Sequence, residues 1–111
     1  MSDEQARRVG LNEALFREVN EQIRGLNREF DAENGMITVI CECGDADCSE
    51  RLEVPVSEYE RARSDSLLFV VAKGHEFPGV EQVVEQTDGY DVVRKKESDA
   101  AEVADETDPR S

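Results

Sequence analysis

All three cysteines of this 111-residue chain lie in one short stretch, Cys41-Glu42-Cys43-Gly44-Asp45-Ala46-Asp47-Cys48. Thiolates are the protein ligands that zinc prefers, and several of them at short spacing can share one tetrahedral ion. Three thiolates leave one position open, and His75, the only histidine, is the candidate fourth ligand. The sequence therefore predicts a closed, structural zinc site, with ligands Cys41, Cys43, Cys48 and His75.

The residues on both sides of this stretch predict a hairpin. Residues 36–40 are apolar and rich in β-branched side chains, as in a strand, and they lead directly into Cys41. Cys41 and Cys43 then point to the same face, and the chain must curl at Gly44, which tolerates positive φ, to return Cys48. Residues 51–56 alternate between polar and apolar side chains, which predicts the return strand of the hairpin. The cysteine stretch is thus predicted to form a zinc knuckle.

The segment that precedes His75 is predicted to be a strand from its hydrophobicity. Residues 67–72 form the most apolar run of the chain, which predicts a buried central strand that ends close to Gly74 and His75. Further on, Asp88-Gly89 separates two valine-containing runs, residues 80–87 and 90–95. Because Asp-Gly favours tight hairpin turns, these runs predict a second hairpin.

Apolar residues recur every three or four positions from Leu11 to Phe30, which predicts an amphipathic helix over about residues 12–30. This stripe would pack on the protein's own sheet, although its spacing also suits a seam with a helix of another chain. Ser57 and Glu60 have the spacing of a capping box and predict a short helix over residues 57–64. The expected stripe consists of Leu11, Leu15, Val19, Ile23, Leu26 and Phe30.

These elements predict an α+β fold in which a long N-terminal amphipathic helix packs on a small antiparallel sheet with a zinc knuckle. Residues 1–10 are expected to be a disordered leader, residues 11–96 a single zinc-stabilised domain, and residues 97–111 a disordered acidic tail. Hydrophobic residues make up 38% of the chain and aromatic residues 5%, so the core is small. A metal ion commonly stabilises a domain of this kind.

Charge and targeting signals restrict the classes of function. The formal net charge is −14, and a field of this sign repels phosphate, which argues against direct binding to nucleic acid or anionic membranes. A protein partner with a basic surface is expected instead. No segment is apolar enough to span a membrane and no secretory signal is apparent, so we expect a cytoplasmic protein with reduced thiols rather than a disulfide scaffold.

Three functions are compatible with the cysteine stretch. The expected function is that of a non-enzymatic module, stabilised by structural zinc, that binds a protein partner and could regulate it. The first alternative is a redox- or metal-responsive regulator, in which thiol oxidation releases the ion. The second is a small zinc hydrolase, with water in place of His75 at the metal, although the expected domain is too small to enclose a sizeable pocket.

Several short motifs carry a resemblance to a family. The string CECGDADCSER at residues 41–51, followed by EYE at 58–60, FVV at 69–71 and GHE at 74–76, resembles uncharacterised small zinc-knuckle-like proteins of high-GC Gram-positive bacteria. The similarity covers most of residues 12–96. That family has no established activity, so the resemblance implies no substrate, reaction or partner. It does imply that the cysteines and the Gly-His-Glu segment belong to one recurring pattern.

Overall fold

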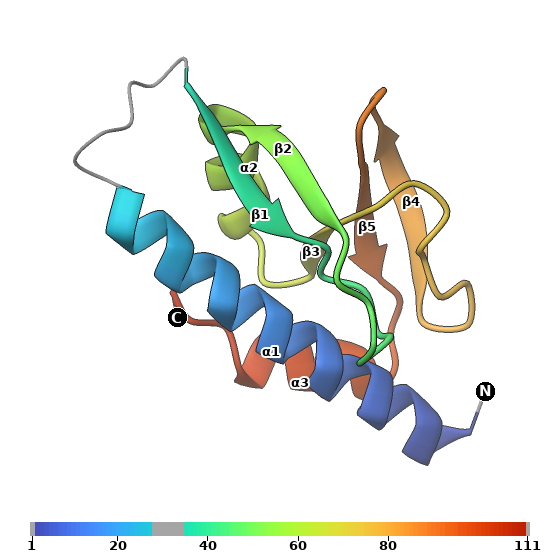
Figure 1. The fold of residues 1–111 in the computed structure, drawn as a ribbon. Helices are drawn as coiled ribbons and strands as arrows, with labels where there is room; N and C mark the ends of the chain where they lie inside the picture. Colours follow the sequence, from blue (N-terminus) through green and yellow to red (C-terminus); the bar gives the residue numbers. More distant parts are fainter. Residues whose placement is uncertain (1, 28–34, 111) are drawn as a thin grey trace.

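The computed structural model describes residues 2–27 and 35–110, and its fold is α+β (Figure 1). A long N-terminal helix packs on antiparallel strands, as predicted, but these strands form two small sheets rather than one. Two shorter helices complete the structure. The elements are, in order, α1 (Asp3–Asn27), β1 (Met36–Ile40), β2 (Arg51–Pro55), α2 (Val56–Arg63), β3 (Leu68–Val71), β4 (Glu81–Gln86), β5 (Asp91–Lys95) and α3 (Asp99–Glu106).

The first sheet is the predicted hairpin. Strands β1 and β2 pair antiparallel from Met36 opposite Pro55 to Ile40 opposite Arg51, so the cysteine stretch forms the connection between them. Alternate residues of both strands are buried, in line with the alternation of the sequence. They pack with Tyr59 of α2 into the largest hydrophobic cluster. Pro55 ends β2, where its missing N–H costs no ladder hydrogen bond.

The second sheet has three strands in the order β3-β5-β4. The predicted hairpin of β4 and β5 is confirmed, and its Asp88-Gly89 turn is closed by a 2.9 Å hydrogen bond from Thr87 N–H to the Tyr90 carbonyl oxygen. The prediction that residues 67–72 form the central strand is wrong, since β5 is central. The outer edge of β3 is nevertheless covered, because the Glu42 N–H donates to the Val70 carbonyl oxygen at 2.8 Å.

The buried face of α1 differs from the predicted one. The predicted stripe is largely on the outside: Leu11, Leu15 and Leu26 are 49%, 61% and 80% exposed. Ile23, farther round the helix, does pack against the core of the first sheet. The face turned inward instead carries small, polar and charged residues at spacings of three and four, namely Ala6, Val9, Gly10, Glu13, Arg17 and Asn20.

Both ends of the described chain are helical, which corrects the predictions of a disordered leader and a disordered tail. Helix α1 begins at Asp3 rather than near residue 12, and α3 occupies residues 99–106 of the predicted tail. The reason is that the two helices pack on each other: a Cβ at Gly10 would lie 2.9 Å from the Ala100 Cα. Residues 28–30 of the predicted helix lie outside the described residues.

The two shorter helices begin in different ways. Helix α3 begins after Ser98, whose hydroxyl oxygen accepts a hydrogen bond from the Ala101 N–H at 3.2 Å. In contrast, the capping box predicted at Ser57 is absent, because α2 begins one residue earlier and its N-cap is Pro55. None of the helices that the structure describes has the length and hydrophobicity needed to cross a membrane.

Candidate metal centre

The four predicted ligands converge on one point. The sulfur atoms of Cys41, Cys43 and Cys48 and a ring nitrogen of His75 all lie within 4.8 Å of one another. Cys41 follows directly on β1, the other two cysteines lie in the connection to β2, and His75 lies four residues beyond β3. This group, called here the Cys/His cluster, could hold a metal ion.

The spacing of the donor atoms fits a tetrahedral ion. His75 Nδ1 lies 3.7 Å from Cys41 Sγ and 3.6 Å from Cys48 Sγ. Zinc binds sulfur at about 2.3 Å and imidazole nitrogen at about 2.0–2.1 Å, so the edge between these donors in a tetrahedron is about 3.6 Å long. The cluster therefore has donor types and two nitrogen-to-sulfur separations that are compatible with a tetrahedrally bound metal ion.

Backbone geometry places His75 beside the cysteines. The turn after β3 contains Gly74 at a φ of +83°, a conformation that a residue with a side chain seldom adopts. The His75 N–H donates to the Ala72 carbonyl oxygen at 3.0 Å, and the Ala72 N–H donates to Cys41 Sγ at 3.1 Å. One residue of this turn thus contacts both halves of the cluster.

Gly44 is needed for space and not for positive φ, which corrects the prediction. Gly74 is the glycine with positive φ among the described residues. A Cβ at Gly44 would lie 2.4 Å from Val9 Cγ1 and 3.2 Å from a ring carbon of Phe77. Asn12 Nδ2 also donates to the Gly44 carbonyl oxygen at 2.8 Å. The connection between β1 and β2 therefore packs directly on α1.

The thiols influence one another's protonation. The hydrogen bond with Cys41 lowers the pKa of Cys43 to about 5, and it raises the pKa of Cys41, with burial adding to the increase. Burial raises the pKa of Cys48. The acidic neighbours Glu42, Asp45 and Asp47 are not the leading causes of these pKa shifts. A bound divalent cation would favour the thiolate at all three positions.

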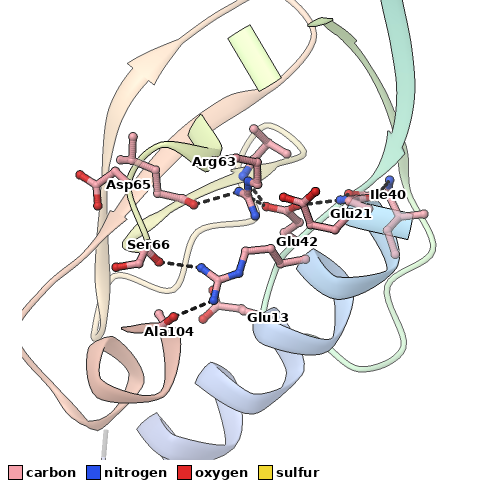
Figure 2. A network of polar contacts seen from close by, with 12 residues as sticks. Glu13, Glu21, Ile40, Glu42, Arg63, Asp65, Ser66 and Ala104 are labelled. Carbon is pink, nitrogen blue, oxygen red and sulfur yellow. Dashed lines mark hydrogen bonds and ion pairs between the residues drawn. The ribbon is translucent and has the colours of Figure 1, made fainter. Parts of the chain in front are cut away.

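Glu42 lies between two candidate ligands in the sequence, and its side chain is fully buried. Its carboxylate accepts hydrogen bonds from Arg63 Nη2 at 2.9 Å, Asn20 Nδ2 at 2.7 Å and the Val70 N–H at 3.0 Å (Figure 2). These donors come from α2, α1 and β3. Because Cys41 and Cys43 flank this residue, its contacts fix the backbone from which both thiols project.

A wider buried network of charges surrounds Phe69. The guanidinium carbon of Arg17 lies 4.6 Å from the centre of the ring, and Lys95 Nζ lies 4.8 Å from it. Arg17 donates at 2.6 Å to the carbonyl oxygens of both Ser66 and Ala104 (Figure 2). Lys95 forms ion pairs with two further buried side chains, Glu13 and Glu81.

Sequence reasoning missed this network, because charged residues on a helix normally lie on its wet face. A signal was present: Glu13, Arg17 and Asn20 continue the helical spacing of Ala6 and Gly10. Small residues at such spacing allow another element to approach closely, and polar residues in line with them point toward the same contact.

The solvent side of the cluster is partly open. Cys41 and Cys43 are buried, whereas Cys48 and His75 are half-buried. An open pocket of about 250 Å³ adjoins the cluster and is lined by Cys43, Asp45, Gly74, His75, Glu76 and Phe77. Solutes can therefore approach the site from this side.

The chain matches no protein-family model, and searches among curated proteins and among solved structures also find no match. The metal centre is therefore inferred from the positions of Cys41, Cys43, Cys48 and His75 alone.

Proposed function

We propose that the protein binds one structural zinc ion through Cys41, Cys43, Cys48 and His75 and acts as a non-enzymatic protein-interaction module. The observation that carries the metal assignment is the convergence of four donor atoms from two separate segments of the chain, all within 4.8 Å of one another. Thiolate and imidazole ligands favour zinc over the hard cations magnesium and calcium. Membership of the zinc-knuckle-like family that the sequence resembles stays a prediction.

Two features support a structural rather than a catalytic ion. Four protein ligands complete a tetrahedron, whereas a catalytic zinc keeps one position for water. In addition, the Cys41 sulfur already accepts a backbone hydrogen bond from Ala72, as expected of a site that is part of the folded framework. We therefore propose that zinc binding and folding are coupled.

The proposed interaction depends on charge. With a net charge of −14, the protein attracts a partner with a basic surface and repels nucleic acid and anionic membranes, so neither of these is a proposed direct ligand. A cytoplasmic location belongs to the same proposal, because the thiols must stay reduced.

The zinc assignment is tested by metal analysis and thermal unfolding of protein purified without added zinc. We expect one zinc per chain in the parent, and loss of both metal and stability in His75→Ala and Cys48→Ser. Ser49→Ala, an exposed neighbour of Cys48, is the matched control and should keep both. A parent without zinc, or a His75→Ala variant with its full complement, would refute the four-ligand site.

The interaction role has its own test. Zinc-loaded protein immobilised on a resin should capture a specific basic protein from cell lysate, and the captured protein should be released by high salt. The His75→Ala variant, which is expected to lack zinc and to be less stable, is the control that shows whether capture requires the folded surface. Absence of any specific capture would refute the interaction role while leaving the zinc assignment intact.

The half-buried thiol of Cys48 favours a second candidate, a redox-responsive regulator. In this function, peroxide oxidises two thiolates of the cluster to a disulfide and is itself reduced to water, and the zinc ion is released. Low peroxide should then release zinc reversibly, with recovery on addition of a thiol reductant. Retention of zinc under these conditions would leave only the structural role.

A further inference from the structure

The outer face of α1 is apolar at its centre although no described residue covers it. Leu11 and Leu15 are 49% and 61% exposed, and the helix turns its opposite face to the rest of the protein. Exposed leucines on a helix that already has a buried face on the other side are unnecessary for folding of the single chain. We define the outer face of α1 by six exposed residues, Glu4, Arg8, Leu11, Leu15, Glu18 and Gln22.

The outer face of α1 has the spacing of a coiled coil. Its positions are separated alternately by four and three residues, which is the a and d pattern of a heptad repeat. Such a seam suits another helix with the same repeat. Leu11 occupies a d position and Leu15 the following a position. In an antiparallel pair of helices, a positions pack against d positions, so Leu11 of one helix can contact Leu15 of the other.

The charges of the outer face of α1 make it complementary to itself in one orientation. When two copies are antiparallel and centred on residue 13, Leu11 of each lies opposite Leu15 of the other, and Arg8 lies opposite Glu18. Glu4 then faces Gln22. A parallel arrangement would instead place Arg8 opposite Arg8 and Glu18 opposite Glu18, which is repulsive. The same surface on both copies makes an isologous twofold contact.

The outer face of α1 carries little net charge. Its one arginine and two glutamates give −1, against −14 for the whole chain. Two copies can therefore meet here with little local repulsion, and salt at about 0.15 M screens more distant charges beyond roughly 8 Å.

We infer that the protein forms a homodimer in which the outer faces of two α1 helices pack antiparallel, with four leucines at the centre and an Arg8–Glu18 pair on each side. Arg8 lies 3.4 Å from Glu4 of its own chain, so in the dimer it is placed between two carboxylates. This inference goes beyond the proposed function and does not depend on the metal.

Sedimentation equilibrium of the full chain at about 0.15 M salt tests the dimer. The parent should dimerise below about 100 µM, and Leu15→Glu should be monomeric with an unchanged circular dichroism spectrum. Val84→Glu adds the same charge at another exposed apolar residue, on β4, and should still dimerise. A parent that stays monomeric at about 100 µM would refute the inference and leave the outer face of α1 for a different protein.

Charge reversal tests the antiparallel orientation. Arg8→Glu and Glu18→Arg should each weaken the dimer about tenfold or more, and an equimolar mixture of the two variants should restore it, because opposite charges then face each other. Arg51→Glu, at an exposed arginine on β2, is the control for the change in net charge. Unchanged dimerisation in the single variants would refute the antiparallel pairing. Zinc content, measured in every sample, reports separately on the proposed metal site.

Discussion

The Asn20 side chain pairs with the backbone of Ile40 through both of its polar atoms. The Ile40 N–H donates to Asn20 Oδ1 and Asn20 Nδ2 donates to the Ile40 carbonyl oxygen, each at 2.8 Å, so the amide acts as a strand partner at the last residue of β1. Asn20 Nδ2 also donates to Glu42 at 2.7 Å. One side chain of α1 thus holds the backbone immediately before Cys41 and the side chain immediately after it.

Removal of this amide should be costly. Asn20→Ala leaves the Ile40 N–H without its acceptor and one Glu42 carboxylate oxygen without one of its donors. We expect the free energy of unfolding to fall by about 3 kcal/mol. Asn12→Ala is the matched control, because Asn12 makes one bond, to the Gly44 carbonyl oxygen, and should cost only about 1 kcal/mol. Urea unfolding measures both, and equal losses would contradict the central role of Asn20.

The ion pair of Glu42 and Arg63 should matter both for stability and for metal binding. Glu42→Gln leaves the buried guanidinium without its carboxylate, which typically costs about 3–5 kcal/mol. Metal affinity should fall as well, because the backbone between Cys41 and Cys43 loses its anchor. Competition with a chromophoric zinc chelator measures the affinity.

The control for this substitution is the exposed pair of Glu58 and Arg61. Glu58→Gln also removes a carboxylate from an arginine, but in water, where such pairs contribute less than about 1 kcal/mol. If Glu42→Gln were as mild as Glu58→Gln, or left zinc affinity at the parental value, the connection between the buried network and the Cys/His cluster would be refuted.

Gly44→Ala should strain the contact between the β1–β2 connection and α1. The new methyl group would lie 2.4 Å from Val9 Cγ1, so α1 or the cysteine loop must shift, and core overpacking of this kind costs about 1–3 kcal/mol. The additional substitution Val9→Ala should recover part of the loss. Gly25→Ala, with no atom within 4 Å of the new Cβ, should instead stabilise by up to about 1 kcal/mol. Thermal unfolding distinguishes these outcomes.

Glu13 should make stability depend on pH. Burial raises the pKa of Glu13 well above its usual value, and the opposing effect of Lys95 is smaller. Between the unfolded and the folded pKa, the unfolded chain releases a proton that the folded protein retains, so stability falls as pH rises through this window. Glu13→Gln removes that proton equilibrium.

Urea unfolding of parent and Glu13→Gln from pH 4 to pH 8 measures the effect. The stability of Glu13→Gln relative to the parent should increase with pH, because only the parent loses stability as position 13 becomes ionised in the unfolded chain. Titrating groups that do not contact Glu13 or its partners Lys95 and Glu81 are common to both proteins and cancel in the difference. Parallel curves would show that Glu13 has the same pKa in the folded and unfolded states.

The Cys/His cluster was predictable because its chemistry is narrow. Few arrangements use three close cysteines and a single histidine, and the strand patterns on both sides determined where Cys41 and His75 would meet. The hairpins were predictable for a similar reason, since alternation in β1 and β2 and the Asp88-Gly89 turn are local signals.

The packing of α1 was not predictable from local signals. Periodicity correctly indicated a helix, but hydrophobicity alone selected the face with Leu11 and Leu15 over the face with Glu13 and Arg17. The inward face is stabilised by partners far away in sequence, such as the Ala104 carbonyl oxygen that Arg17 binds. For the same reason α3 was missed: its acidic composition suggested a tail, whereas Ala100 and Ala104 are buried against other elements.

The contact of Arg17 with Ala104 also bears on how the protein is made. Helix α1 precedes all other described elements during synthesis, and α3 follows them, yet 87 residues separate the two sides of this hydrogen bond. The Arg17 guanidinium therefore cannot make this hydrogen bond until α3 has left the ribosome. Such distant pairing slows folding. Closure of the core around Arg17 is consequently a late event that follows translation of the strands instead of accompanying it.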